Sequence, residues 1–394
     1  MLIAKPYPSY IKYMGSKSKI IDFIIEGINE VHSDDQPILD LFSGSASLAG
    51  AIGRQATLQS NDIQSYSGIL ADAYTLAWRD TDTPLVDEII KEAEKEISQY
   101  ESDIADYLID YSQCNTLEAF NKAEEKQREL ISFHFSHKNH LFLKNYSGTW
   151  WSAKQCMWID AIRKVAETHK DNSAFPVIMS SLMFAMAYCS QGTGHYAQYR
   201  DAKTVSSMKD ILIYRGRDLA SYFSRKYKEV LAALETSPPQ TASSSTSLDF
   251  KDSLKGFKKG VVYADPPYCF VHYSRFYHAI ETLVRYDFPE LQIKSEKIVK
   301  GRYRVDRHQS PFSIHSKVSS AFKDLFTGVQ EGESNLVLSY SNTGMISLEE
   351  LSDIANDIFK GRNIELLSTD HQHMTLGRQG IRHRDVKECL LLVK

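Results

Sequence analysis

A short apolar run that ends in a glycine turn and leads into a helix is the feature that most restricts the fold of this chain. The run 37–43 has Ile38, Leu39 and Leu41 at its centre, and an Ala/Leu-rich stretch with helical spacing begins at Ser47. A second short run, 56–60, ends at Asn61-Asp62. Strand, helix and strand in this order form the unit of a parallel sheet covered by helices. The sequence therefore predicts an α/β fold.

Strand and helix signals divide the chain into three stretches. Segments with helical spacing occupy the middle of the chain, at 85–111, 117–135, 152–168 and 174–187. The stretch 236–247, with two prolines and a Ser/Thr run, has the composition of a loop or linker. Strand signals return at 260–264, 335–341, 364–369 and 389–393, with helical spacing at 348–359. We therefore predict one α/β domain in two parts, 1–80 and 251–394, interrupted by a mostly helical insertion over 81–250.

Composition excludes several classes of protein. Of 394 residues, 42% are hydrophobic and 24% are charged, which is typical of a chain with a large buried core. Apolar runs are too short for a membrane span and the N-terminus lacks the pattern of a secretory signal, so we expect a cytoplasmic chain with no membrane partner. The five cysteines are widely scattered, which indicates neither a disulfide framework nor a metal site.

Charge is uneven along the chain, although the net charge is only −4. The stretch 82–129 has 14 Asp/Glu against 5 Lys/Arg, a balance of −9, whereas 251–307 has 12 Lys/Arg against 7 Asp/Glu, a balance of +5. Binding of nucleic acid through bulk charge is therefore excluded. We expect a polyanion, if one binds, to contact the second stretch and to avoid the first.

The glycine turn and the end of the second strand together suit a nucleotide-like group. Gly44 allows close backbone approach, the following helix offers free amide groups, and Asp62 is placed to accept both hydroxyls of a ribose. A diphosphate-binding fold would have glycines where Ala46 and Ala49 stand, so a ribose-bearing cofactor without a pyrophosphate fits better. The alternatives are a tight turn that needs a glycine and an aspartate that caps a helix.

A second group of polar atoms follows the strand at 260–264. Asp265, Pro266, Pro267 and Tyr268 come directly after it. Two prolines cannot extend a central strand, and they fix the backbone so that the carboxylate and the carbonyls project at the carboxyl edge of the sheet. An aspartate acceptor, a rigid carbonyl and an aromatic face suit a planar group that bears an NH2. The alternative is a turn with a tyrosine packed beneath it.

These two motifs resemble those of the AdoMet-dependent DNA adenine-N6 methyltransferases of the Dam-like, D12 class. Asp265-Pro-Pro-Tyr268 matches the family's DPPY catalytic motif, and Phe42-Ser-Gly44 matches its cofactor motif. The chain departs from the family pattern at Ala46, where a second glycine is usual. Because alanine adds only one methyl group to the turn, we expect cofactor binding to survive this change.

Further matches extend the resemblance over nearly the whole chain. Lys12-Tyr13-Met-Gly15-Ser-Lys17 resembles the N-terminal cofactor motif of the class, and Asn61-Asp62 matches its acidic ribose position. The order of the motifs is that of the alpha group. The resemblance implies a Rossmann-like class I AdoMet-dependent methyltransferase sheet, with the inserted helical region as the DNA target-recognition region.

The resemblance also assigns roles to individual residues. Asp265, Pro266, Pro267 and Tyr268 are the expected catalytic residues. The residues expected to bind the cofactor, S-adenosyl-L-methionine (AdoMet), are Tyr13, Lys17, Phe42, Gly44, Ser45, Asp62 and Asp265. Within this set, Lys17 is the expected partner of the methionyl carboxylate and Asp62 that of the ribose. No metal is required.

The expected partner is double-stranded DNA, in a restriction-modification or phage-defence setting. A cognate restriction endonuclease or defence-system protein is a further candidate partner. Arg302, Arg304 and Arg307 are the candidate DNA contacts, to phosphates or guanine edges, and the alternative for each is a solvated charged loop. Two other functions stay open: an RNA methyltransferase acting on an exocyclic base amine, and a catalytically inactive AdoMet or nucleic-acid binding module.

Overall fold

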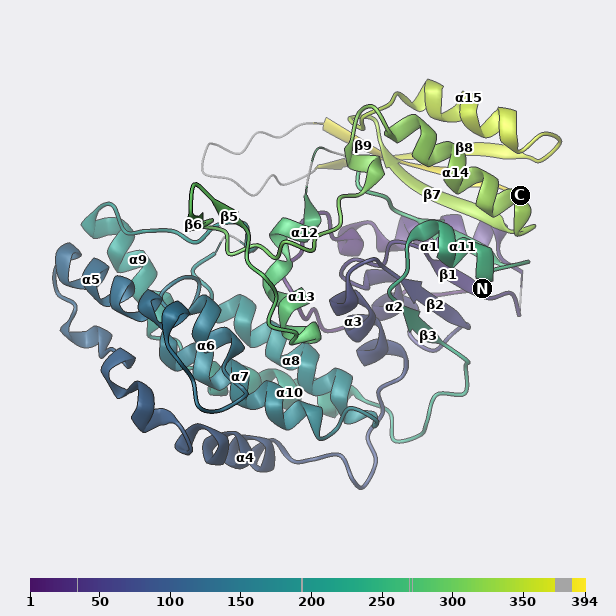
Figure 1. The fold of residues 1–394 in the computed structure, drawn as a ribbon. Helices are drawn as coiled ribbons and strands as arrows, with labels where there is room; N and C mark the ends of the chain where they lie inside the picture. Colours follow the sequence, from purple (N-terminus) through teal and green to yellow (C-terminus); the bar gives the residue numbers. More distant parts are fainter. Residues whose placement is uncertain (34, 193, 269, 271, 373–384) are drawn as a thin grey trace.

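A seven-stranded, mostly parallel sheet is the centre of the molecule (Figure 1). The computed structural model describes residues 1–33, 35–192, 194–268, 270, 272–372 and 385–394. The strand order is β3-β2-β1-β4-β7-β9-β8, and β9 runs antiparallel to both of its neighbours. The strands of this sheet are β1 Ile38–Asp40, β2 Leu58–Asn61, β3 Ser244–Thr246, β4 Val261–Ala264, β7 Asn335–Ser341, β8 Ile364–Gln372 and β9 Asp385–Val393. This arrangement confirms the predicted α/β fold with a mostly parallel sheet.

Helices cover both faces of the sheet. Those within or beside the two sheet-forming parts are α1 Ile21–Val31, α2 Ser47–Ile52, α3 Ser65–Thr75, α11 Phe250–Gly256, α12 Tyr273–Phe276, α13 His278–Arg285, α14 Val318–Glu331 and α15 Leu348–Ile358. Side chains alternate between the faces, as the pleat of a strand requires. In β4, Val261 and Tyr263 join the core cluster that contains α1, whereas Val262 and Ala264 join the cluster that contains α11, α14 and α15.

The described residues between β2 and β3 form helices, turns and one isolated bridge. After α3, the helices of this segment are α4 Val86–Ser98, α5 Leu117–Arg128, α6 Leu141–Tyr146, α7 Ala153–Glu167, α8 Ala174–Cys189, α9 Val205–Arg215 and α10 Leu219–Ala233. Short 3-10 turns lie at Lys17–Lys19, Glu101–Tyr107, Tyr111–Gln113, Glu129–Ser132 and Pro311–Ser313. None of the described helices combines the length and the apolar composition that crossing a bilayer needs.

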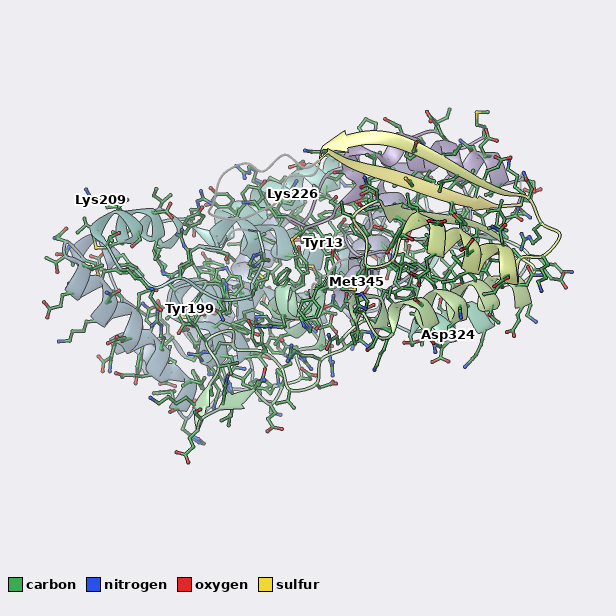
Figure 2. All side chains as sticks on the ribbon, turned by 90° about the horizontal axis from the view of Figure 1, so that it is seen from above. Tyr13, Tyr199, Lys209, Lys226, Asp324 and Met345 are labelled. Carbon is green, nitrogen blue, oxygen red and sulfur yellow. The ribbon has the colours of Figure 1, made fainter. Side chains whose placement is uncertain are left out.

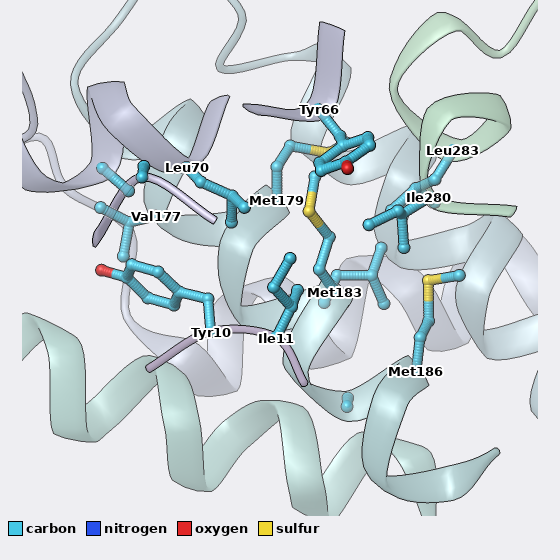
Figure 3. Packing of buried hydrophobic residues seen from close by; sticks show 14 of the residues in the cluster. Tyr10, Ile11, Tyr66, Leu70, Val177, Met179, Met183, Met186, Ile280 and Leu283 are labelled. Atoms are coloured by element: carbon cyan, nitrogen blue, oxygen red, sulfur yellow. The ribbon is translucent and has the colours of Figure 1, made fainter. Parts of the chain in front are cut away.

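Methionines of α8 pack against both the helical segment and the sheet-forming parts (Figure 3). Met179 and Met183 lie in one buried cluster with Tyr66 of α3 and Ile280 of α13. Unbranched methionine side chains fill such irregular spaces well. One continuous core therefore joins the helical segment to one face of the sheet.

The prediction of a linker over 236–247 is wrong for its last residues. Ser244, Ser245 and Thr246 form β3, which pairs in parallel with β2 at the edge of the sheet. An edge strand has one neighbour, and here its side chains are exposed or half-buried. It therefore carries no apolar run that sequence periodicity could detect.

A long connection follows β4 before the sheet resumes at β7. It contains α12, α13 and a small antiparallel hairpin of β5 Ile293–Lys294 and β6 Lys297–Ile298, which stands out from the surface in Figure 1. The two turn residues, Ser295 and Glu296, both have positive φ, as in the turns that suit tight hairpins. All four strand residues of the hairpin are exposed.

Candidate active site

The glycine turn between β1 and α2 forms one wall of a pocket at the carboxyl edge of the sheet. Gly44 has φ +51°, and a Cβ built on it would lie 3.0 Å from the Tyr13 hydroxyl oxygen. The left-handed backbone and the packed tyrosine both favour glycine at this position. The amide of Gly44 donates to Asp62 Oδ2 at 3.0 Å, and the Ser43 hydroxyl donates to the Asn61 carbonyl at 2.7 Å. The turn is thus tied to the end of β2.

Ala46, the departure from the family pattern, also has a left-handed backbone. Its φ is +56° and its side chain is fully buried. A left-handed alanine costs about 1–2 kcal/mol relative to a right-handed one. The departure therefore affects backbone strain as well as the approach of a ligand to the turn.

Asp62 lies directly after β2 and accepts two backbone hydrogen bonds. Oδ2 accepts from Gly44, and Oδ1 accepts from the amide of Gln64 at 2.9 Å, at the start of α3. Burial raises the pKa of Asp62 to about 6, although these two hydrogen bonds act in the opposite direction. Each carboxylate oxygen has a second acceptor site, so Asp62 can hold the turn and still accept hydrogen bonds from a ligand.

The loop after β4 brings Asp265 and Tyr268 to the same pocket. Lys17 Nζ lies 3.1 Å from Asp265 Oδ1 and 3.2 Å from Oε1 of Glu388, a residue of β9. The Tyr268 hydroxyl donates to the same Glu388 oxygen at 3.2 Å, and the Lys17 ammonium lies 5.1 Å from the centre of the Tyr268 ring. The Tyr268 ring also packs against the ring of Tyr340 of β7 in a T-shaped arrangement.

Tyr13 closes the pocket from the N-terminal segment. Its ring stacks on Tyr277 at 4.5 Å between centroids and on Tyr273 at 5.8 Å. Figure 2 shows Tyr13 near the middle of the molecule, between the helical segment and the sheet. Gly15, with φ +81°, leaves room for the Tyr273 hydroxyl, because a Cβ there would lie 3.1 Å from it.

The pocket gathers most of the residues that sequence motifs single out. Its lining includes Tyr13, Lys17, Phe42, Gly44, Ser45, Asp62, Asp265, Pro266, Pro267 and Tyr268. The roles of these residues stay predictions, but their places in the fold agree with one shared site. Carboxyl edges of neighbouring parallel strands meet at one side of a sheet, which is why motifs far apart in the sequence converge here.

Two acidic residues of this region are not among those that the sequence motifs predict. Asp40, the last residue of β1, is 2% exposed and lines the pocket. Burial, and then the charges of Asp265 and Asp62, raise the pKa of Asp40 well above its usual range. Glu388 is 1% exposed and directly precedes the apolar residues 389–393 of β9. An acidic residue next to apolar strand residues is the sequence signal in both cases, and it is too common a pattern to mark a site.

The three arginines predicted to contact DNA have partners within the protein. Arg302 is buried and donates to the carbonyl of Asn145 at 3.0 Å. Arg304 is 3% exposed and holds Asp287 through two hydrogen bonds of 2.7 and 2.6 Å. Arg307 donates to the Gln292 side chain at 3.3 Å. Internal pairing gives Arg304 a structural role, and DNA contact by any of the three stays a prediction.

A mostly parallel α/β sheet with a glycine turn and an acidic Pro-Pro loop at its carboxyl edge is consistent with a methyltransferase fold. Residues 13–149 match the family model of the D12 class N6 adenine-specific DNA methyltransferases. The match begins at Tyr13, includes Lys17, the glycine turn and Asp62, and ends before the Asp265 loop. The resemblance to the D12 class is thus confirmed.

Proteins similar to this chain include three bacterial modification enzymes. The modification methylase LlaI of Lactococcus lactis subsp. lactis is 23% identical over 372 residues, which is 94% of this chain and 53% of that protein. The modification methylase StsI of Streptococcus sanguinis is 22% identical, over 88% of this chain and 46% of that protein. The type II methyltransferase M.FokI of Planomicrobium okeanokoites is 23% identical, over 87% of this chain and 46% of that protein. The chain spans about half the length of these curated relatives.

Proposed function

We propose that this chain is a site-specific DNA adenine-N6 methyltransferase that uses AdoMet. The observation that carries the proposal is the convergence of the glycine turn and the Asp265 loop on one pocket. One part of this pocket suits a cofactor and the other suits a base amine. The match to the D12 family and the three modification enzymes support the same activity.

The pocket fits AdoMet in charge and in hydrogen bonding. Oδ1 of Asp40 is buried and has no hydrogen-bond partner among the described residues, so a donor on a ligand would satisfy it. Four carboxyl groups line the described part of the pocket, from Asp40, Asp62, Asp249 and Asp265, against the ammonium group of Lys17. The sulfonium and ammonium charges of AdoMet would favour the ionised form of these carboxyl groups, of which Asp40 and Asp62 have a raised pKa. Asp62 would hold the ribose, and Lys17 would contact the methionyl carboxylate.

The residues of the Asp265 loop would act on the target amine. When bound, AdoMet supplies an activated methyl group, so the task of the protein is to aim the adenine N6 lone pair at it. That lone pair is delocalised into the ring. Hydrogen bonds from the amino group to the Asp265 carboxylate and the Pro266 carbonyl favour a pyramidal nitrogen and stabilise the positive charge that develops. Pro267 keeps the loop rigid, and Tyr268 stacks on the adenine.

Adenine inside a duplex cannot reach this pocket, so the base must be flipped out of the helix. Flipping costs a few kcal/mol, which stacking and contacts to the opened duplex offset. We assign target recognition to the helical segment 81–250 together with the basic connection after β4. A restriction-modification or defence setting, with a cognate endonuclease or defence protein as partner, agrees with the modification enzymes that the chain resembles.

Methyl transfer from tritium-labelled AdoMet to DNA and to RNA, measured side by side, tests the proposal. We expect label on adenine N6 of DNA. Asp265→Ala should lower turnover to less than about a tenth of wild type, because it removes a preorganised acceptor for the developing charge. Asp265→Asn should also be severely impaired, since its amide can present a donor where an acceptor is needed.

Asp252→Asn is a suitable control, because Asp252 is an exposed aspartate on α11 that pairs with Lys255. It should behave as wild type. Labelling of RNA alone would favour the RNA methyltransferase alternative, and AdoMet binding without transfer to either polymer would favour an inactive binding module. If Asp265→Ala keeps more than about a tenth of wild-type turnover, Asp265 does not have the proposed catalytic role.

A further inference from the structure

Glu388 joins three parts of the site through one oxygen atom. Its Oε1 accepts from Lys17 Nζ and from the Tyr268 hydroxyl, both at 3.2 Å. Lys17 lies in the turn after Gly15, Tyr268 in the loop after β4, and Glu388 in β9. No sequence motif of the site includes Glu388.

We propose that Glu388 is a positioning residue that aligns Asp265 and Tyr268 for methyl transfer. The inference rests on the proposed function. By holding Lys17, Glu388 places the ammonium 3.1 Å from Asp265 Oδ1, which directs the carboxylate toward one orientation. By accepting from the Tyr268 hydroxyl, it restrains rotation of the ring that would stack on the adenine.

Burial strengthens the interactions of Lys17 with Asp265 and Glu388. Side chains of Lys17 and Glu388 are 8% and 1% exposed, and that of Asp265 is 17% exposed. Water competes poorly for charges at such depth, so each of these interactions is stronger than it would be at a surface. An ammonium group has three donors. Lys17 donates one hydrogen bond to Glu388 and forms an ion pair with Asp265, so its ammonium can also serve the methionyl carboxylate that the resemblance assigns to it.

Steady-state kinetics of Glu388→Ala and Glu388→Gln test the inference. The alanine variant should lower kcat by about tenfold or more, because it removes hydrogen bonds to a charged group at both Lys17 and Tyr268. The AdoMet dissociation constant should change by a smaller factor than kcat, because Glu388 contacts Tyr268 of the loop that holds the base directly and would act on the cofactor through Lys17. The glutamine variant keeps an acceptor oxygen and should recover most of the activity.

Glu365→Ala is the matched control, because Glu365 lies on the neighbouring strand β8 and pairs with Lys394 away from the pocket. It should leave kcat unchanged. A double-mutant cycle of Tyr268→Phe with Glu388→Ala adds a test of the hydroxyl interaction. If Glu388 acts partly through that hydroxyl, the two effects on kcat should be less than additive.

A second readout does not depend on activity. Burial alone would lower the pKa of Lys17, but Asp265 and Glu388 together raise it. Among the residues that the structure describes, the groups that face the ammonium are these two carboxylates with Tyr268 and Tyr273. NMR titration of labelled lysine side chains, with Lys17→Arg to assign the signal, should show a lower Lys17 pKa in Glu388→Gln than in wild type.

Two results would overturn the inference, and a third would contradict the proposed function instead. Wild-type kcat in a folded Glu388→Ala variant, or an unchanged Lys17 pKa in Glu388→Gln, would show that Glu388 does not position the site. Failure of the wild-type protein to methylate DNA would instead contradict the proposed function, while the NMR titration would still test the interaction between Glu388 and Lys17.

Discussion

Asp62 has a structural task that precedes any contact with a ligand. Its carboxylate accepts from Gly44 in the glycine turn and from Gln64 at the start of α3. Burial nevertheless raises its pKa to about 6, so the ionised form is less stable in the folded protein than in the unfolded chain. The folded state therefore binds more protons than the unfolded state between about pH 4 and pH 6, and the Asp62 contribution to the free energy of unfolding falls as the pH rises through this range.

The raised pKa of Asp62 predicts a pH-dependent affinity for AdoMet. A carboxylate accepts from both ribose hydroxyls, whereas its protonated form loses an acceptor. We expect the dissociation constant to rise as the pH falls through about 6. Calorimetry from pH 5 to 7.5 measures this change. Asp62→Asn should bind AdoMet weakly at every pH, and its dissociation constant should not change with pH as that of wild type does. If the dissociation constants of both proteins change equally with pH, Asp62 is not the titrating group.

The residues of the site were predictable where they belong to short motifs. Gly44, Asp62, Asp265 and Tyr268 could be singled out because each stands in a recognisable pattern beside a strand, whereas Tyr13 was singled out by the resemblance of its N-terminal motif to that of the D12 class. Asp40 and Glu388 could not, since their importance comes from burial next to other charges. The left-handed backbone of Ala46 was also hidden, because its φ depends on the packing of the turn.

Elements with an apolar run were predicted close to their observed bounds, and those without one were not. The prediction at 335–341 coincides with β7, and that at 174–187 is close to α8, Ala174–Cys189. The expected helix 85–111 ends at Ser98 and continues as 3-10 turns. Strand β3 was missed, because its Ser-Ser-Thr sequence owes its extended form to pairing with β2. Tertiary pairing rather than local propensity decides such elements.

One buried ion pair joins two helices of the helical segment. Arg215 of α9 binds both carboxylate oxygens of Glu124 on α5 and donates to the carbonyls of Thr149 and Trp150. The two side chains are 0% and 2% exposed. The pair thus connects α5, α9 and the loop before α7.

We expect Arg215→Ala to lower the free energy of unfolding by about 3–5 kcal/mol, because it leaves the Glu124 charge buried without its partner. Urea unfolding followed by circular dichroism measures the change. Lys126→Ala on α5, the helix that carries Glu124, removes an exposed partner of Glu129 and should lower the free energy of unfolding by less than about 1 kcal/mol. Equal losses in the free energy of unfolding for the two variants would show that burial does not govern the strength of the ion pair between Arg215 and Glu124.

Across the whole molecule, the charge of the β5–β6 hairpin contrasts with that of the acidic helices α4 and α5. Lys294 and Lys297 lie directly opposite each other in the hairpin, and both are exposed. Like charges in such a pair are destabilising, so a bound phosphate backbone would relieve their repulsion. The segment 82–129, which includes α4 and α5, has a charge balance of −9 and is unsuited to that partner.

Replacing both hairpin lysines with glutamine should weaken DNA binding and flatten its dependence on salt. The slope of log affinity against log salt should fall by about 0.9 for each phosphate that the protein no longer neutralises. The control makes the same charge change at Lys91 on α4 and Lys122 on α5, and should leave the slope unchanged. Fluorescence anisotropy with duplex DNA at several salt concentrations gives both slopes. If the hairpin variant keeps the wild-type slope, the phosphates must lie elsewhere.

The hydrogen bond between Lys17 and Glu388 spans 371 positions in the sequence. A ribosome that adds roughly 5–20 residues per second needs on the order of half a minute to make the chain between them. During that time a nascent chain has its glycine turn, and later its Asp265 loop, but not the carboxylate that aligns Lys17 and Tyr268. If Glu388 positions the site as proposed, full methyl transfer begins only after β9 has been synthesised and has entered the sheet between β7 and β8.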